Sequence, residues 1–123
     1  MESNDDTLQP SLWDKVTTSE SCIAAALYTL CKDRHRYVGR GKWEFLEQGE
    51  LEWKADKDKL QLRRSMINAS TQALERAMFW FEKRQDVDAV LKQDTLMCIV
   101  NKLKSVQSQN AIMKEAKDYF VAE

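Results

Sequence analysis

The scarcity of residues that interrupt helices constrains this chain most. Its 123 residues include three glycines and one proline, while 43% are hydrophobic and 32% are charged. An all-β fold needs turn residues roughly every ten positions, and this chain does not supply them. A chain of this length can also bury a sizeable core without disulfide staples. We therefore expect one mainly α domain over residues 10–123, preceded by a flexible acidic tail at residues 1–9.

Apolar residues at helical spacing predict three long helices. The first covers residues 11–35, either continuously or in two pieces, because residues 17–21 have poor helix propensity. The second covers residues 56–84 with Asp56 or Asp58 as its cap, and the third runs from Asp94 to about residue 121. Helices of matched length pack best side by side. The predicted fold is an elongated bundle of three helices, the second and third antiparallel.

The second predicted helix carries two apolar stripes. One stripe consists of Leu60, Ile67, Leu74, Met78 and Phe81. The other consists of Leu62, Met66, Ala73 and Trp80. Two stripes make a wide apolar face, so we expect this helix to be buried against more than one neighbour.

The third predicted helix carries a seam whose members are three and four residues apart, as in a coiled coil. The seam consists of Leu96, Ile99, Leu103, Val106, Asn110, Met113 and Phe120. Its polar member, Asn110, has two interpretations. It either fixes the register or oligomeric state of the seam, or marks the point at which the seam leaves the core.

Residues 36–55 predict an insertion between the first and second helices. The alternating segments Trp43–Phe45 and Leu51–Trp53 flank Gly49, which favours a β-hairpin that pairs Phe45 with Leu51 and Trp43 with Trp53. A short helix is the alternative, because Trp43 and Trp53 also fit a helical stripe. Gly49 would weaken such a helix.

The reactive side chains do not form a recognisable catalytic or metal motif. His35 is the sole histidine, and Asp33 is the one nearby carboxylate in the sequence that could orient it. Cys22, Cys31 and Cys98 lack the spacing of a structural zinc site. We can name no nucleophile, base and orienting group at workable spacing. The sequence therefore predicts a protein that is not an enzyme and that holds no metal and no cofactor.

The cysteine count and the length of the apolar runs indicate in which cellular compartment the protein is located. Three cysteines without close pairs do not resemble a secreted disulfide framework. The first residues are acidic, unlike the start of a signal peptide. The longest apolar run, residues 22–31, is about half the length that a membrane span requires. We expect a cytoplasmic or nuclear protein that is not secreted and does not bind membranes.

A surplus of aromatic side chains favours a binding function. A helix cannot bury four consecutive residues that point in all directions, and leftover aromatics on a protein surface commonly mark a partner site. The sequence predicts a non-catalytic helical interaction module that acts as an adaptor, a regulator or a small subunit of an assembly. Its partner is another protein or a second copy, as in a homodimer. The candidate partner-binding residues are Phe79, Trp80, Phe81, Asn110 and Met113.

Nucleic-acid binding through residues 32–43 is the alternative function. The net charge of −1 excludes a chain that is basic overall, so such binding requires a local patch. Phosphates need cations and free N–H groups, and bases need flat faces on which to stack. The candidate residues are Lys32, Arg34, Arg36, Tyr37, Arg40, Lys42 and Trp43. A basic turn after a helix also complements the helix dipole, which is a structural explanation for the same residues.

Overall fold

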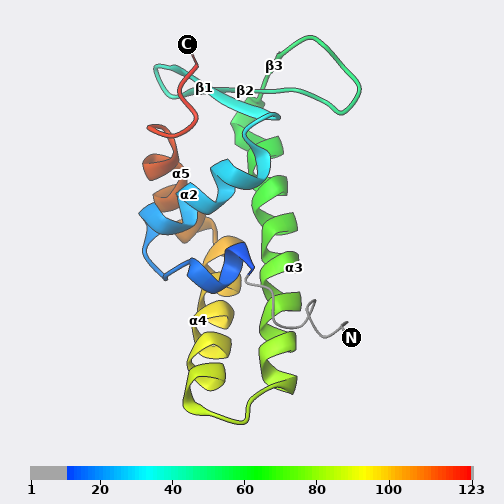
Figure 1. Ribbon diagram of the computed structural model, residues 1–123. Helices are drawn as coiled ribbons and strands as arrows, with labels where there is room; N and C mark the ends of the chain where they lie inside the picture. The colour runs from blue at the N-terminus through cyan, green and yellow to red at the C-terminus, as the bar shows by residue number, and fades with distance from the viewer. Residues whose placement is uncertain (1–10, 123) are drawn as a thin grey trace.

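The computed structural model describes residues 11–122 and shows a mainly helical chain with a small antiparallel sheet (Figure 1). The predicted acidic tail at residues 1–9 lies outside the described residues. In chain order, the helices and strands are the 3₁₀ helix η1 (Leu12–Lys15), α2 (Glu20–Cys31), β1 (His35–Gly39), β2 (Lys42–Phe45), β3 (Lys54–Ala55), the 3₁₀ helix η2 (Lys57–Lys59), α3 (Leu60–Glu82), α4 (Val87–Lys104) and α5 (Val106–Ala116).

The predicted first helix is present as two pieces, η1 and α2, but it ends at Cys31 and not at residue 35, because His35 already belongs to strand β1. The hydroxyl of Ser11 caps η1, and the hydroxyl of Ser19 accepts a hydrogen bond from the N–H of Cys22 at 3.1 Å to cap α2. Between them Val16 has an extended backbone, with φ −84° and ψ 131°. Serine side chains satisfy the N–H groups that a helix start leaves unpaired, so the two caps favour a break over a continuous helix.

Helices α3 and α4 lie side by side as an antiparallel hairpin, as predicted for the second and third helices (Figure 1). The helix predicted from residue 56 begins later, at Leu60, but the side chain of Asp56 still binds its first turn. Both carboxylate oxygens of Asp56 accept hydrogen bonds, from the N–H groups of Gln61 and Leu62, at 2.8 and 2.9 Å. The predicted start of the next helix at Asp94 is wrong. Instead the carboxylate of Asp86 accepts a bond from the N–H of Ala89 at 2.9 Å and caps α4.

The predicted third helix is interrupted at Ser105, which has an extended backbone and separates α4 from α5. Two polar groups stabilise this break. The hydroxyl of Ser105 accepts a bond from the N–H of Ser108 at 3.4 Å, and the amide of Gln109 donates to the carbonyl of Leu103 at 2.7 Å. A single 94–121 helix is therefore wrong, and three long helices become four α-helices in the described part of the chain.

The break divides the predicted seam. Leu96, Ile99 and Leu103 are buried on α4, whereas Val106 and Asn110 are exposed on α5. The residues beyond them return to the core: Met113 and Phe120 are buried.

The predicted insertion is a three-stranded sheet, with strand order β1-β2-β3. The turn between β1 and β2 contains Gly39, Arg40 and Gly41, all with positive φ. The hairpin pairing of Phe45 with Leu51 is wrong, because Phe45 pairs with Lys54 and Leu51 is 98% exposed. Strand β2 ends at Phe45, and residues 46–53 form a loop before β3, so the return strand starts later than predicted. The short-helix alternative is also wrong for this segment.

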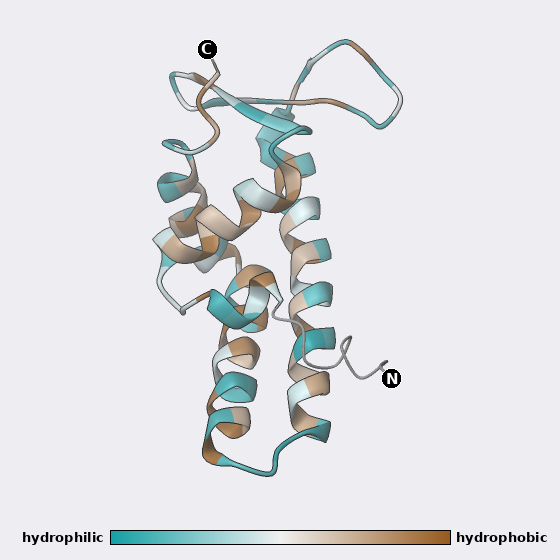
Figure 2. Ribbon diagram, viewed as in Figure 1, coloured by the Kyte–Doolittle hydropathy of each residue, from teal (hydrophilic) through white to brown (hydrophobic). Residues whose placement is uncertain are grey.

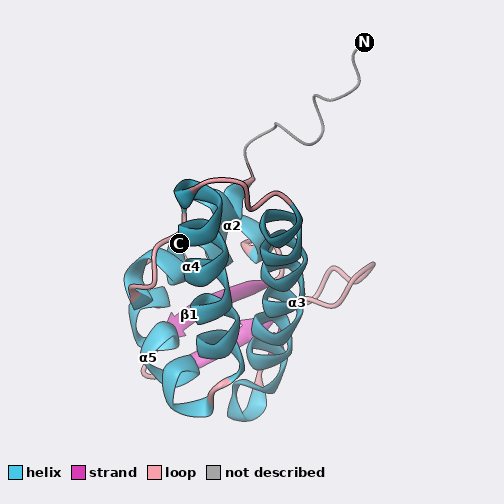
Figure 3. Cartoon of the chain, turned by 90° about the horizontal axis from the view of Figure 1, so that it is seen from below, coloured by secondary structure: helices cyan, strands magenta, loops and turns pink. Residues whose placement is uncertain are grey.

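The core lies between the α3–α4 hairpin and the crossing pair α2 and α5. The sheet covers the end of the helices opposite the α3–α4 connection, and Figure 3 shows its strands running across the helix axes. The C-terminal segment extends this sheet: the N–H of Tyr37 donates to the carbonyl of Phe120 at 2.8 Å, and the N–H of Ala122 donates to the carbonyl of Tyr37 at 2.9 Å. None of the helices within residues 11–122 is both long enough and apolar enough to cross a lipid bilayer.

Candidate functional site

An exposed apolar stripe runs along α3. We call it the α3 stripe, and it consists of Leu60, Ile67, Leu74, Met78 and Phe81. Leu74 is half-buried, and the other four side chains are between 40% and 50% exposed. At 100° per residue, these five positions lie within an arc of about 60° on the helix surface. The stripe therefore forms one continuous face of a helix whose length is about 34 Å.

The helical spacing of apolar residues predicted this stripe but did not predict that it is exposed. The second stripe of α3 faces the core, where Leu62, Met66 and Ala73 are buried. The α3 stripe lies to one side of that buried face and stays exposed within residues 11–122. The prediction that both stripes are buried against neighbours is therefore wrong. An exposed apolar stripe on an ordered helix is a feature of surfaces that bind other helices.

A second apolar group lies at the end of the hairpin where α3 connects to α4. Val87, Val90 and Leu91 are exposed on the first turns of α4. Figure 2 shows this start of α4 in brown, directly after the teal connection from α3. Met78 and Phe81 lie on the last turns of α3, at the same end of the hairpin. The apolar surface is thus densest near the α3–α4 connection.

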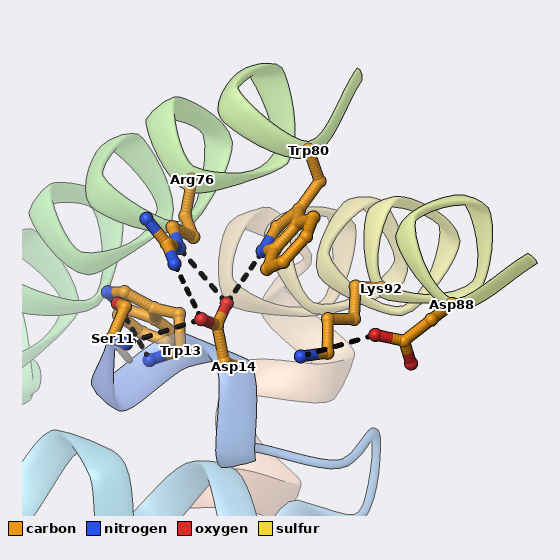
Figure 4. A network of polar contacts seen from close by, with 7 residues as sticks. All are labelled: Ser11, Trp13, Asp14, Arg76, Trp80, Asp88 and Lys92. Carbon is orange, nitrogen blue, oxygen red and sulfur yellow. Dashed lines mark hydrogen bonds and ion pairs between the residues drawn. The ribbon is translucent and has the colours of Figure 1, made fainter. Parts of the chain in front are cut away.

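A polar network fixes this end of the hairpin to η1 (Figure 4). The carboxylate of Asp14 accepts hydrogen bonds from Arg76 Nε at 3.0 Å and Arg76 Nη2 at 2.6 Å, and from Trp80 Nε1 at 2.7 Å. Burial acts to raise the pKa of Asp14, but the hydrogen bonds from Arg76 and Trp80 outweigh it and hold that pKa below its ordinary value. The network joins residues more than sixty positions apart and gives α3 a defined orientation.

The three predicted aromatic residues have different environments. Trp80 is half-buried, and its indole N–H donates a hydrogen bond to the carboxylate of Asp14. Phe79 is half-buried and makes an edge contact with Trp80, with ring centroids 5.2 Å apart. Phe81 is exposed as part of the α3 stripe, and the guanidinium of Arg84 lies 4.4 Å from its ring centroid. Of the three, Phe81 offers the most surface to a partner.

The other two predicted partner-binding residues lie on α5, away from the aromatic group. Asn110 is exposed, and its side-chain oxygen accepts a hydrogen bond from Arg63 Nη2 at 2.7 Å. Met113 is buried in the core. Both lie beside the start of α3, whereas the residues 79–81 lie at its end. The structure therefore does not bring the five predicted residues together into one surface.

The basic segment forms the end of α2, strand β1 and the start of β2. Tyr37 pairs with Trp43, so these two aromatic side chains share the face of the sheet that packs on the helices. Trp43 is buried and cannot stack on a base in this conformation. Arg40 and Lys42 are exposed at the β1–β2 turn. The structure thus separates the exposed cations from the aromatic partners that the alternative function requires.

The remaining cations of this segment have mixed roles. Arg36 forms an ion pair with Glu44 at 2.6 Å and lies over the ring of Trp53, with 4.4 Å to the ring centroid. Lys32 and Arg34 are exposed near the end of α2. Lys32 lies 6.0 Å from the ring centroid of Tyr28. Arg36 is therefore a structural cation, while Lys32 and Arg34 remain accessible.

A histidine–serine pair is a feature that sequence reasoning missed. His35 Nε2 lies 2.7 Å from Ser65 Oγ, the separation of a nucleophile from its base. Burial lowers the pKa of His35 to about 4, and its Nδ1 has no hydrogen-bond partner among the described residues. An imidazole of such low proton affinity, without a group to orient it, is a poor general base near neutral pH.

The cysteines are separate from one another and differ in exposure. Cys31 is buried, which raises the pKa of its thiol to about 11, while Cys22 is half-buried and Cys98 is exposed. Within residues 11–122, no three His, Cys, Asp or Glu side chains are grouped as a metal site would need.

Comparison of the chain with known protein families, with curated proteins and with solved structures found no match.

Proposed function

We propose that this protein is a non-catalytic helical interaction module that binds through the α3 stripe. The single observation that carries the proposal is an apolar stripe along one face of a 23-residue helix, in which Leu60, Ile67, Met78 and Phe81 are exposed and Leu74 is half-buried. The neighbouring face of α3, with Leu62, Met66 and Ala73, already packs against the core, and most of the stripe lies outside that contact. Burying this face against a partner helix removes apolar surface from water, which is favourable.

The spacing of the stripe identifies a helix as the partner. Leu60, Ile67, Leu74 and Phe81 follow one another at intervals of seven residues, which is the repeat that keeps a seam facing a second helix. Met78 adds to the same face. An extended peptide or a flat surface would not use this periodicity.

The partner to which we commit is a second copy of the same chain. In an antiparallel pair of α3 helices, Leu60 of one copy lies opposite Phe81 of the other, and Ile67 lies opposite Leu74. This arrangement is self-complementary, as a twofold interface requires. It also brings Arg64 of one copy within one turn of Glu75 of the other, on the same flank of the seam. Two such pairs of opposite charge form across the twofold axis and favour this register.

The expected interface is small, because each side chain of the stripe is already about half-buried. Interfaces below the standard size of roughly 1,200 Å² are commonly transient. We therefore expect self-association with a dissociation constant on the order of tens of micromolar or weaker.

Sedimentation equilibrium of the pure protein over a range of concentrations tests the proposal. The wild type should form dimers, and Ile67→Glu should be monomeric because it places a charge in the seam. The new glutamate lies next to Arg63 and Arg64 on α3, so the substitution should leave the helix itself intact. The control is Val106→Glu, which makes a similar change on exposed α5 and should dimerise as the wild type does. A wild type that stays monomeric up to about 1 mM, or a control that loses dimerisation equally, would refute the proposal.

Nucleic-acid binding remains the second candidate, because Arg34, Arg40 and Lys42 are exposed near the sheet. Fluorescence anisotropy of a labelled RNA oligomer, titrated across salt, tests it. Binding that weakens with salt and is lost in Arg40→Ala/Lys42→Ala would support RNA binding at the β1–β2 turn. The control is Lys83→Ala/Lys104→Ala, which removes the same number of positive charges elsewhere. Equal binding by both double variants would exclude the β1–β2 turn.

A further inference from the structure

A basic pocket lies beside the sheet, between the start of α3 and the end of α5. Its volume is about 460 Å³, within the range of small-molecule sites. Four cations line it, from two separate segments of the chain: Lys59, Arg63, Lys114 and Lys117. None of the described residues that line the pocket is acidic. Four positive charges therefore converge on one concave surface without a carboxylate among them.

Neutral groups hold two of these cations in place. Arg63 Nη1 donates to the side-chain oxygen of Gln109 at 2.9 Å, and Nη2 donates to that of Asn110 at 2.7 Å. The ammonium of Lys117 lies 5.5 Å from the ring centroid of Tyr37. These contacts position the charges but do not neutralise them. A cation fixed in this way costs little further ordering when it binds an anion.

The backbone before α3 is strained where it presents Lys59. Asp58 and Lys59 both have φ of 58°, in the left-handed region that residues with side chains rarely occupy. Two successive residues in this conformation are unfavourable unless the surroundings fix them. The carboxylate of Asp56 accepts hydrogen bonds from the N–H groups of Gln61 and Leu62 at the same helix start and does not line the pocket.

The wall of the pocket contains an unused hydrogen-bond donor. Trp43 lines the pocket and is 2% exposed, and its indole Nε1 is buried with no partner among the described residues. Buried donors without an acceptor are rare because leaving such a group unpaired destabilises the fold. Because Trp43 lines the pocket, its indole N–H is a probe of an anion bound there.

We propose that this pocket binds the phosphoryl group of a small phosphorylated molecule. Phosphoryl oxygens accept several charge-assisted hydrogen bonds at once, which matches a guanidinium and three ammonium groups around one cavity. The site is independent of the α3 stripe, so it stands or falls separately from the proposed function. A small ligand fits better than a nucleic-acid strand, because the one tryptophan of the wall is buried and offers no exposed face for base stacking.

Titration of the ¹⁵N-labelled protein with inorganic pyrophosphate, followed by NMR, tests the pocket. The Trp43 indole N–H resonance, assigned by triple-resonance experiments, should shift and saturate. The resonances of the other indoles should move little. Lys114→Gln/Lys117→Gln removes two pocket cations and should weaken binding about tenfold or more. Lys83→Gln/Lys104→Gln removes two exposed cations elsewhere and should bind within about twofold of the wild type.

Three results would overturn the proposal. One is the absence of a saturable shift at the Trp43 indole in the wild type. Another is equal weakening by both double variants, which would mean that pyrophosphate responds to net charge alone. The third is an RNA oligomer that shifts the Trp43 indole and loses affinity in Lys114→Gln/Lys117→Gln while pyrophosphate has no effect. That outcome would assign the pocket to a polymer backbone rather than to a small ligand.

Discussion

Replacing Asp14 with asparagine tests how the aromatic end of α3 is held in place. The carboxylate of Asp14 is the acceptor that joins η1 to Arg76 and Trp80 (Figure 4). Asparagine has nearly the same shape but no charge. We expect the Asp14→Asn variant to lose about 2–3 kcal/mol of unfolding free energy.

The magnitude follows from the geometry of the pair. The side chains of Asp14 and Arg76 are 7% and 15% exposed, which places their ion pair close to the buried limit. Removing one member of a buried pair costs about 3–5 kcal/mol. Two features reduce that cost here. The guanidinium of Arg76 also lies 4.1 Å from the ring centroid of Phe79, and the oxygen of asparagine can still accept the indole N–H of Trp80.

Urea unfolding followed by circular dichroism measures this loss. Asp88→Asn is the control, because Asp88 is 71% exposed and pairs with Lys92 at 3.6 Å on the same helix. Such a surface pair contributes about 0.5 kcal/mol or less. The pKa of Asp14 is lowered in the folded state, so its contribution is complete above the unfolded pKa and is lost as pH falls through the folded pKa. A loss below about 1 kcal/mol at pH 7, or equal losses in both variants, would refute this reasoning.

Three further predictions concern other parts of the fold. The sole histidine, His35, should titrate near pH 4 by NMR, and a midpoint near 6.5 would contradict its burial. Because the pKa of His35 in the folded state lies below 6.5, the free energy of unfolding should fall by as much as about 3 kcal/mol as pH falls from 6.5 to 4. Iodoacetamide should modify Cys98 first and Cys22 more slowly, and Cys31 should react only after unfolding, which mass spectrometry of timed samples can check. Leu51→Asn should change the urea midpoint by less than the equivalent of about 0.5 kcal/mol, whereas a large loss would favour the Phe45–Leu51 pairing.

Local chemistry predicted the helical segments better than their breaks. The scarcity of glycine and proline correctly indicated a mainly helical chain, and Asp56 does bind the first turn of α3, although that helix begins at Leu60 and not at residue 56. The break at Ser105 was missed because serine is only a weak helix breaker. The available signal was Ser105 itself, because serine is a preferred N-cap residue and its hydroxyl accepts the backbone N–H of residue 108. The same kind of signal, Asp86 before Ala89, was overlooked in favour of Asp94.

The candidate surfaces depend on tertiary placement, which a single sequence does not encode directly. Periodicity found both stripes of α3, but it could not show that only one of them meets the core. The basic pocket was missed for a related reason: Lys59 and Arg63 are far from Lys114 and Lys117 in the sequence, and the two pairs meet only because α5 packs beside the start of α3. Counting cations in a continuous segment instead selected residues 32–43, whose aromatic members face inward.

Charge reversal across the proposed dimer tests the central claim most directly. In the antiparallel arrangement, Arg64 of one copy lies near Glu75 of the other, and the twofold axis creates this pair twice in each dimer. Arg64→Glu and Glu75→Lys should each weaken dimerisation in sedimentation equilibrium by about fivefold, since each surface pair contributes roughly 0.5 kcal/mol. The double variant Arg64→Glu/Glu75→Lys should restore the affinity of the wild type. If the double variant is as weak as the single variants, or if neither single variant has an effect, α3 does not pair with itself in this register and the account is contradicted.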